Sequence, residues 1–251
     1  MSELISIKMM KDELRAAQDT MLPFFIEKYK HDERRGAAEL VQRAQKMLKL
    51  LEKEKERLES IKKYEREYAQ YEYICGIDEV GRGPLAGPVV AGAVILPKDC
   101  NILYINDSKK LSEQKREELY DIIMEEAISV SVGMVSPSRI DEINILQATY
   151  EAMRIAVKDL DKKPDILLND AVTIPEVKIK QVPIIKGDEK SISIGAASII
   201  AKVTRDRLMK QYDELMPEYG FASHKGYGTK AHLEAIHVHG ISPIHRKSFI
   251  N

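Results

Sequence analysis

The chain has 251 residues, of which 44% are hydrophobic and 31% are charged, and its formal net charge is −1. It lacks the uncharged apolar run of ~20 residues that a membrane-spanning helix needs, and its acidic N-terminal segment has no apolar core of the kind that a secretory signal requires. These features exclude membrane-spanning and secreted classes, and we expect a soluble, cytoplasmic protein in which Cys75 and Cys100 are reduced thiols.

Charge is unevenly distributed along the chain. Residues 1–70 carry 16 basic and 14 acidic side chains, residues 71–177 carry 11 basic and 19 acidic, and residues 178–251 carry 12 basic and 7 acidic. An acidic centre followed by a basic C-terminal third is the pattern expected of a metal site beside a phosphate-binding surface, although many ordinary domains share it.

Residues 1–70 are expected to form helices, because they contain one proline, Pro23, and one glycine, Gly36, which follows a charged run and predicts a break between two helices. Apolar residues then recur at helical spacing, namely Leu40, Ala44, Met47, Leu48, Leu51, Leu58 and Ile61. Two interpretations stay open: a hairpin that only stabilises the protein, or an accessory arm that binds substrate.

Residues 71–251 are expected to form an α/β domain, because three early strands precede alternating helices and strands, which favours a mixed sheet. The strands are predicted at residues 73–78, 88–96, 128–135, 165–169 and 181–185. The helices are predicted at residues 143–160, 193–215 and 229–239.

Four carboxylates follow or end predicted strands. Asp78 and Glu79 close the first strand, Asp170 closes a later one, and Asp188 lies between the last strand and a helix. Because adjacent side chains on a strand point to opposite faces, Asp78 and Glu79 can serve one site only if the chain bends at Glu79. Buried carboxylates need a cation, and carboxylates collected from separate strand ends suit a pair of divalent cations.

Three further segments suit a nucleic-acid ligand. The turn Gly81-Arg82-Gly83 exposes backbone N–H groups and carries a guanidinium between two glycines. Lys202 and Arg205 share one face of the helix expected at 193–215. Tyr227, held between two glycines in a basic loop, is a platform for a sugar or base.

Together and in this order, these segments resemble the ribonuclease HII family. The matching strings are YICGIDEVGRGPLAGPVVAGAVILP, NDSKKLSEQKREELY, KGDEKSISIGAASIIAKVTRDR and HKGYGTKAHLEAI followed by GISPIHRKSF, which cover residues 73–249. The resemblance implies a ribonuclease H-like fold, a mixed central sheet flanked by helices, at residues 71–251 with C-terminal helices. A helical extension at residues 1–70 is similar to bacterial versions of the enzyme from low-GC Gram-positive organisms.

The resemblance also implies the roles of individual residues. It assigns Asp78, Glu79, Asp170 and Asp188 as ligands of Mg²⁺ or Mn²⁺, two ions in all. It assigns a set of substrate-binding residues: Gly81, Arg82 and Gly83 at the ribonucleotide junction, Tyr227 in stacking, and Lys109 and Lys202 on phosphates. Asn169 departs from the family, which has an apolar residue there, and its polar side chain needs a hydrogen-bond partner.

The implied activity is endonucleolytic cleavage of RNA/DNA hybrids and of DNA duplexes that contain ribonucleotides, on the 5′ side of the ribonucleotide, leaving 5′-phosphate and 3′-hydroxyl ends. We expect a monomer that acts in DNA replication and repair. Two alternatives stay open: another nuclease of the same fold, such as a junction resolvase, and a non-catalytic nucleic-acid-binding protein. A zinc site at His232, His237 and His239 is disfavoured, because no acidic or cysteine ligand accompanies them.

Overall fold

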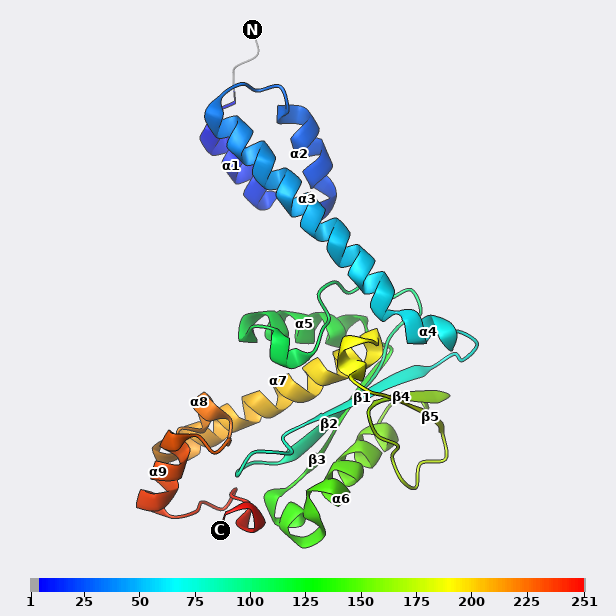
Figure 1. Cartoon of the computed structure of the whole chain (residues 1–251), viewed down its shortest axis with the longest axis vertical. Coiled ribbons are helices and arrows are strands. Elements are labelled where there is room, and N and C mark those ends of the chain that lie inside the picture. Colours follow the sequence, from blue (N-terminus) through cyan, green and yellow to red (C-terminus); the bar gives the residue numbers. More distant parts are fainter. Residues whose placement is uncertain (1–4, 251) are drawn as a thin grey trace. The chain divides into compact units, whose positions relative to one another are not determined.

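The chain, seen as a computed structural model that describes residues 5–250, divides into two compact units, Met1–Glu59 and Ser60–Asn251 (Figure 1). Within the described residues, no helix combines the length and apolar character needed to cross a bilayer. Each unit is described separately below.

The first unit is helical, as predicted. It contains α1 (Ile7–Ala16), the short 3-10 helix η1 (Asp19–Met21), α2 (Leu22–Tyr29) and most of α3 (Arg35–Ile61). The break between helices lies just before Gly36, which falls in the first turn of α3. The side chain of Asp32 stabilises this break, since it accepts hydrogen bonds from the backbone and the guanidinium of Arg34.

The helices of the first unit enclose a small apolar core of their own. Leu40 and Ala44, part of the stripe predicted from the sequence, are buried there on α3. They belong to a cluster that draws on all three helices and includes Met10, Leu14, Leu22, Phe25, Tyr29, Ala37 and Val41. This part of the stripe therefore stabilises the first unit itself.

The second unit is built on a five-stranded mixed sheet with the order β3-β2-β1-β4-β5. Its strands are β1 (Ile74–Val80), β2 (Val89–Ile95), β3 (Ser129–Val135), β4 (Ile166–Asp170) and β5 (Lys180–Ile184). The first three pair antiparallel, whereas β1 with β4 and β4 with β5 are parallel. The carboxyl ends of β1, β4 and β5 therefore share one edge of the sheet.

Helices cover both faces of this sheet. On one face α6 (Pro137–Lys158) packs on β2 and β3, and on the other α7 (Ile192–Leu215) packs on β1 and β2 (Figure 1). The backbone of α7 approaches β1 so closely that a Cβ atom on Gly76 would overlap the backbone of Ser193. This close approach brings the α7 face within reach of Asp78, since Gly76 and Asp78 lie on the same side of β1.

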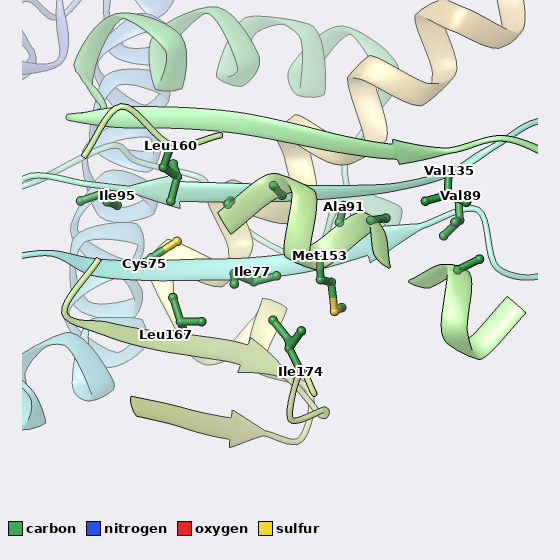
Figure 2. Packing of buried hydrophobic residues seen from close by; sticks show 14 of the residues in the cluster. Cys75, Ile77, Val89, Ala91, Ile95, Val135, Met153, Leu160, Leu167 and Ile174 are labelled. Carbon is green, nitrogen blue, oxygen red and sulfur yellow. The ribbon is translucent and has the colours of Figure 1, made fainter. Parts of the chain in front are cut away.

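The main apolar core lies between the sheet and α6 (Figure 2). Ile77 on β1, Ala91 on β2 and Met153 on α6 are fully buried in it. Residues 88–96 were expected to be buried on both faces, and all seven residues of β2 are buried. The two-sided burial fixes the sheet on which the candidate site is built.

Two helices differ from the prediction: one was not predicted at all, and the other begins earlier than predicted. The helix α5 (Glu113–Glu126), which packs on α7, was not expected, because its polar sequence gives a weak apolar stripe. The helix expected from residue 143 is the second part of α6. At Asn144 the backbone turns to a φ of +67°, and the Asn144 side chain caps the next turn by accepting from the N–H groups of Leu146 and Gln147.

The remaining elements of the second unit are short helices around the sheet. Before β1 stands α4 (Lys63–Glu67), and α8 (Phe221–His224) and α9 (Lys230–His239) follow α7. The 3-10 helices are η2 (Ser108–Lys110), η3 (Gly187–Glu189), η4 (Pro217–Tyr219) and η5 (Lys247–Phe249).

Candidate active site

The four predicted carboxylates come from elements that end at one edge of the sheet. Asp78 lies on β1, Asp170 is the last residue of the parallel neighbour β4, and Asp188 lies in η3, which follows β5. The backbone N–H of Gly187 donates to Asp170 Oδ1 at 2.7 Å, which ties η3 to the end of β4. Glu79 follows Asp78 on β1, and together these four residues are called the carboxylate cluster.

Asp78 is the most deeply buried member of the carboxylate cluster, with 6% of its surface exposed. Burial, reinforced by the neighbouring charges of Glu79 and Asp170, raises its pKa well above the ordinary value. A hydrogen bond from the Ser198 side chain on α7 and one from the N–H of Glu79, at 2.8 Å, partly oppose this rise. The ionised form of Asp78 is thus disfavoured by burial and by two neighbouring carboxyl groups.

Glu79 does not mark a bend in the chain, contrary to expectation. The ladder with β2 continues through Glu79 and Val80, and the chain turns only at Gly81, where φ is +91°. Burial raises the pKa of Glu79, although the guanidinium of Arg82, whose Nη1 lies 3.3 Å from Glu79 Oε1, acts against the rise. Asp170 also acts on Glu79, so an unbroken strand end still leaves Glu79 within electrostatic reach of the cluster.

The pKa of Asp188 is raised as well. Burial and the charge of Asp170 raise its pKa to about 6, and Asp107 contributes through its charge and a hydrogen bond. Asp107 is itself buried and caps η2 by accepting from the N–H of Lys109 at 3.0 Å. Sequence reasoning missed Asp107, although it stands in the segment that supplied Lys109.

Lys109 provides positive charge at the cluster. Burial opposes its protonation, but the charges of Asp107, Asp78, Asp188 and Asp170 outweigh burial and raise its pKa. One ammonium faces at least four carboxyl groups, so the site retains an excess of negative charge.

The donor set of the carboxylate cluster fits hard divalent cations. Its ligands are carboxylate oxygens, which Mg²⁺ and Mn²⁺ prefer, and their raised pKa values show that charge compensation is lacking. Within residues 5–250, no three Asp, Glu, His or Cys side chains already stand as a finished coordination shell. The cluster therefore supplies the charge and chemistry for cations without being preformed around one.

The predicted turn Gly81-Arg82-Gly83 lies directly after the carboxylates and is held by a buried arginine. Arg246 donates from Nη1 to the carbonyl of Arg82 at 3.0 Å and from Nη2 to the carbonyl of Gly81 at 2.5 Å. It also donates from Nε to the carbonyl of Gly87 at 3.0 Å. One guanidinium thus joins the first two residues of the turn to Gly87 from inside the fold.

Tyr227 lies against this turn, although more than 140 residues separate the two in the sequence. A Cβ atom on Gly83 would stand 3.8 Å from Cε1 of the Tyr227 ring, and 43% of the Tyr227 surface is exposed. The carbonyl of Gly226 accepts from the N–H of Leu85 at 2.8 Å, which joins the two loops. An exposed aromatic ring and a backbone-rich turn therefore form one surface.

The two basic residues predicted on α7 have different environments. Lys202 pairs with Asp206 across 2.7 Å and is half-buried. Arg205 is fully buried and donates to the carbonyls of Pro88, Ala86 and Lys225. It therefore connects residues 81–88, called the turn segment, to residues 224–228, called the tyrosine loop. Of these two residues, Arg205 is thus a structural support for the loops.

Asn169, the departure from the family pattern, is fully buried, and its amide nitrogen has hydrogen-bond partners. Its Nδ2 donates to Gln181 Oε1 at 2.8 Å and to the carbonyl of Val172 at 3.1 Å. Its Oδ1 lacks a hydrogen-bond partner. Gln181 in turn binds the backbone of Ile174, so Asn169 anchors the loop after β4.

The three histidines of the zinc interpretation do not form a group of possible metal ligands within residues 5–250. His232 is buried, whereas His237 and His239 are exposed on α9. His232 instead approaches His224 and His245, with which it makes ring contacts.

Comparison with known proteins places both parts of the chain. The family model described as ribonuclease HII matches residues 75–251, and the model of the ribonuclease HII N-terminal domain matches residues 6–69. The ribonuclease HII of Lachnoclostridium phytofermentans is 64% identical over 224 residues, which are 89% of this chain and 88% of that protein. The ribonuclease HII of Clostridioides difficile is 55% identical over 98% of this chain and 97% of that protein. Among solved structures, ribonuclease H2 from Pyrococcus horikoshii OT3 is similar with a TM-score of 0.60 and 30% identity, covering 70% of this chain and 93% of that one.

Proposed function

The chain belongs to the ribonuclease HII family, and on that premise we propose that it is an endonuclease that cleaves the RNA strand of RNA/DNA hybrids and cuts duplex DNA on the 5′ side of an embedded ribonucleotide. The products are a 5′-phosphate and a 3′-hydroxyl. Its substrate-binding residues are Gly81, Arg82, Gly83, Lys109, Lys202 and Tyr227.

The observation that carries this proposal is the contact between Tyr227 and the Gly81-Arg82-Gly83 turn. The turn follows Glu79 of the carboxylate cluster by one residue, and the Tyr227 ring stands 3.8 Å from the Cβ position of Gly83. The 2′-hydroxyl is the group that distinguishes RNA from DNA at a single sugar, and backbone groups can bind it without reading the base. Cleavage should therefore depend on sugar identity and be independent of base sequence.

The carboxylate cluster is proposed to hold two divalent cations, Mg²⁺ or Mn²⁺, through Asp78, Glu79, Asp170 and Asp188. When bound, such cations supply Lewis-acid activation of a water and charge stabilisation at the leaving 3′-oxygen. The protein contributes the negative charge that attracts them, and Lys109 and Arg82 contribute positive charge beside it. Phosphate oxygens bind well to such ammonium and guanidinium groups.

We further propose that the enzyme acts as a monomer in the cytoplasm, in ribonucleotide excision repair and DNA replication. Cys75 and Cys100 are free and buried, which suits a reducing compartment.

The experiment is a cleavage assay on four matched duplexes with Mg²⁺: DNA with one ribonucleotide, all DNA, an RNA/DNA hybrid and double-stranded RNA. We expect cleavage of the first and third, with end mapping that yields 3′-hydroxyl and 5′-phosphate termini at the 5′ side of the ribonucleotide. A Tyr227→Ala variant should lose most of its preference for the ribonucleotide, and an Asp78→Asn variant should not cut.

The same assay separates the alternatives. A junction resolvase would cut a four-way DNA junction and ignore the embedded ribonucleotide. A non-catalytic binding protein would shift the labelled duplex in a gel-shift experiment but would leave it uncut with Mg²⁺ or with Mn²⁺.

A further inference from the structure

Three histidines from consecutive elements near the C-terminus pack behind Tyr227. His224 ends α8, His232 lies on α9, and His245 precedes Arg246 near the C-terminus. The rings of His224 and His232 stack at 4.2 Å between centroids, and those of His232 and His245 lie 5.1 Å apart. His232 and His245 are 0% and 3% exposed. These residues are called the histidine cluster.

The hydrogen bonds of the histidine cluster allow only one arrangement of protons. His232 Nδ1 lies 2.9 Å from the carbonyl oxygen of Tyr227, which can only accept, so Nδ1 carries the proton. His232 Nε2, 3.0 Å from His245 Nε2, must then be the acceptor, and His245 Nε2 the donor. His245 Nδ1 in turn accepts from the backbone N–H of Ser242 at 2.8 Å, and the Ser242 hydroxyl, 2.7 Å away, can donate to the same nitrogen.

His224 is fixed by the same logic. Its Nε2 lies 2.8 Å from the carbonyl of Tyr219 and must donate, and its Nδ1 accepts from the N–H of Gly226 at 3.1 Å. Each imidazole therefore has one donor nitrogen and one acceptor nitrogen, which is the neutral state of the ring. A second proton on any of them would place two donors face to face.

The surroundings keep His232 and His245 neutral. Burial, followed by the neighbouring His232, lowers the pKa of His245 to about 4, and burial also lowers the pKa of His232. The charged groups that reach the adjoining backbone are cationic. The guanidinium of Arg205 binds the carbonyl of Lys225, the ammonium of Lys225 binds the carbonyl of Ala222, and Arg246 follows His245 directly. Tyr219 packs on the His245 ring as a neutral phenol.

The hydrogen bonds of the cluster end on the loop that presents Tyr227. His232 holds the Tyr227 carbonyl, and His224 holds the N–H of Gly226, the residue before it. His245 connects this loop to the turn segment, because Ala86 and His245 pair as an isolated β-bridge. The cluster thus fixes the backbone on both sides of the Tyr227 side chain while the ring stays exposed.

We propose that His224, His232 and His245 are positioning residues, a chain of neutral imidazoles that sets Tyr227 against the Gly81-Arg82-Gly83 turn for ribonucleotide recognition. This role rests on the proposed function of Tyr227. The histidines do not touch substrate. They act through the backbone of the tyrosine loop.

The matched variants are His232→Asn and His232→Gln. The amide nitrogen of Asn lies near the position of Nδ1 and keeps the bond to the Tyr227 carbonyl. The amide oxygen of Gln can lie near the position of Nε2, where it accepts from His245 Nε2 and keeps only that bond. Each retains one of the two hydrogen bonds, so a purely structural role predicts similar effects on melting and on activity. A positioning role predicts that KM for a single-ribonucleotide duplex stays near the wild-type value for Asn and rises roughly three- to tenfold for Gln, the loss expected for one hydrogen bond.

A double-mutant cycle with Tyr227→Ala gives the decisive comparison. In the Tyr227→Ala background, His232→Gln should add little further loss, because its route to the substrate is already gone. His237→Asn, an exposed histidine on the same helix, is the control and should leave activity unchanged. Equal KM values for the Asn and Gln variants, or fully additive losses in the cycle, would overturn the positioning role.

A measurement without substrate separates this inference from the proposed function. Imidazole ¹⁵N shifts of the full-length protein at pH 7 should show His232 as the Nδ1–H tautomer and His224 and His245 as Nε2–H tautomers, all neutral. A charged or tautomerically mixed His232 would overturn the proton arrangement whether or not the protein cleaves. If the wild-type protein showed these tautomers but did not cleave the ribonucleotide duplex, the proposed function would fail and the proton arrangement of the histidine cluster would remain.

Discussion

The guanidinium of Arg246 donates to the carbonyl oxygen of Arg82 at 3.0 Å, so a fully buried arginine near the C-terminus holds the backbone of an exposed arginine in the Gly81-Arg82-Gly83 turn. Burial lowers the pKa of Arg246 to about 9, and nearby Arg205 adds to the decrease. The cation nevertheless persists at neutral pH and is compensated by carbonyl dipoles of Gly81, Arg82 and Gly87.

We predict that Arg246→Lys lowers both stability and activity although the positive charge is retained. A lysine ammonium cannot donate to three carbonyls at once as the planar guanidinium does. Unfolding free energy should fall by about 2 kcal/mol or more, and kcat/KM on the single-ribonucleotide duplex by at least about tenfold. Thermal melting and steady-state kinetics well below the melting temperature test this. Arg139→Lys, at an exposed ion pair, is the control. A variant with wild-type kinetics would show that the turn needs no such support.

Asp78→Asn and Asp170→Asn should each abolish cleavage and leave duplex binding largely intact. Both change a carboxylate of the cluster into an amide of the same shape, which weakens the hold on divalent cations but leaves the turn and Tyr227 in place. Cleavage with Mg²⁺ and gel-shift affinity in its absence are the measurements. Asp161→Asn, at an exposed carboxylate, serves as the control. Near-wild-type cleavage by Asp170→Asn would show that the four-carboxylate assignment is wrong.

The raised pKa of Asp188 predicts how stability depends on pH. Its folded value of about 6 exceeds the ordinary 3.8, so the folded state binds the proton more tightly. Its stabilising contribution is complete below pH 3.8 and is lost as pH rises through 6. In EDTA, Asp188→Asn should therefore melt higher than wild type above pH 6 and equally below about pH 4. Mg²⁺ should raise the melting temperature of wild type at pH 8 and so reduce the difference in melting temperature between wild type and Asp188→Asn. A variant that is less stable at pH 8 in EDTA would contradict this sign.

The features that could be predicted from the sequence are those encoded locally. Apolar runs located all five strands, and turn glycines with carboxylates at strand ends located the cluster. The polar helix α5 was not predicted because its burial depends on α7, a contact with no local signal. For the same reason the supporting roles of Arg205 and Arg246 were not seen, since their partners lie more than 100 residues away in the turn segment. Asp107 could have been noticed, because it caps the short helix that carries Lys109.

Glu65 offers a second pH-dependent prediction. Its Oε1 accepts from the Ser191 hydroxyl at 2.5 Å and from the N–H of Ser193 at 3.1 Å, at the start of α7, while its Oε2 is buried without a hydrogen-bond partner. Burial raises its pKa above 4.5, so its contribution to stability declines as pH rises above that value.

Glu65→Gln keeps the Oε1 acceptor and removes the ionisable proton. It should raise the melting temperature by a few degrees at pH 8, with the difference shrinking at pH 5, as followed by circular dichroism. Glu65→Ala removes both hydrogen bonds and should lower the melting temperature at either pH. If Glu65→Gln were less stable than wild type at pH 8, the charge at this position would be a stabilising one.

Deletion of residues 1–59 tests the role of the first unit. That unit contains its own apolar core, formed by α1, α2 and α3, in which the stripe residues Leu40 and Ala44 are buried. The remaining chain, Ser60–Asn251, contains the whole sheet, the carboxylate cluster and the tyrosine loop. We therefore expect the shortened protein to fold and to cut the same sites.

Duplex affinity should fall on this deletion, because basic residues of the first unit that neutralise phosphates release counterions on binding. If two or three such residues contact the duplex, the slope of log K against log salt should become shallower by roughly 2–3. The competing interpretation is that the first unit serves stability alone. Binding at several salt concentrations and thermal melting, both on the shortened protein and the full chain, decide between them. Unchanged affinity and salt slope, together with a melting temperature many degrees lower, would mean that the first unit stabilises the enzyme and does not hold its substrate.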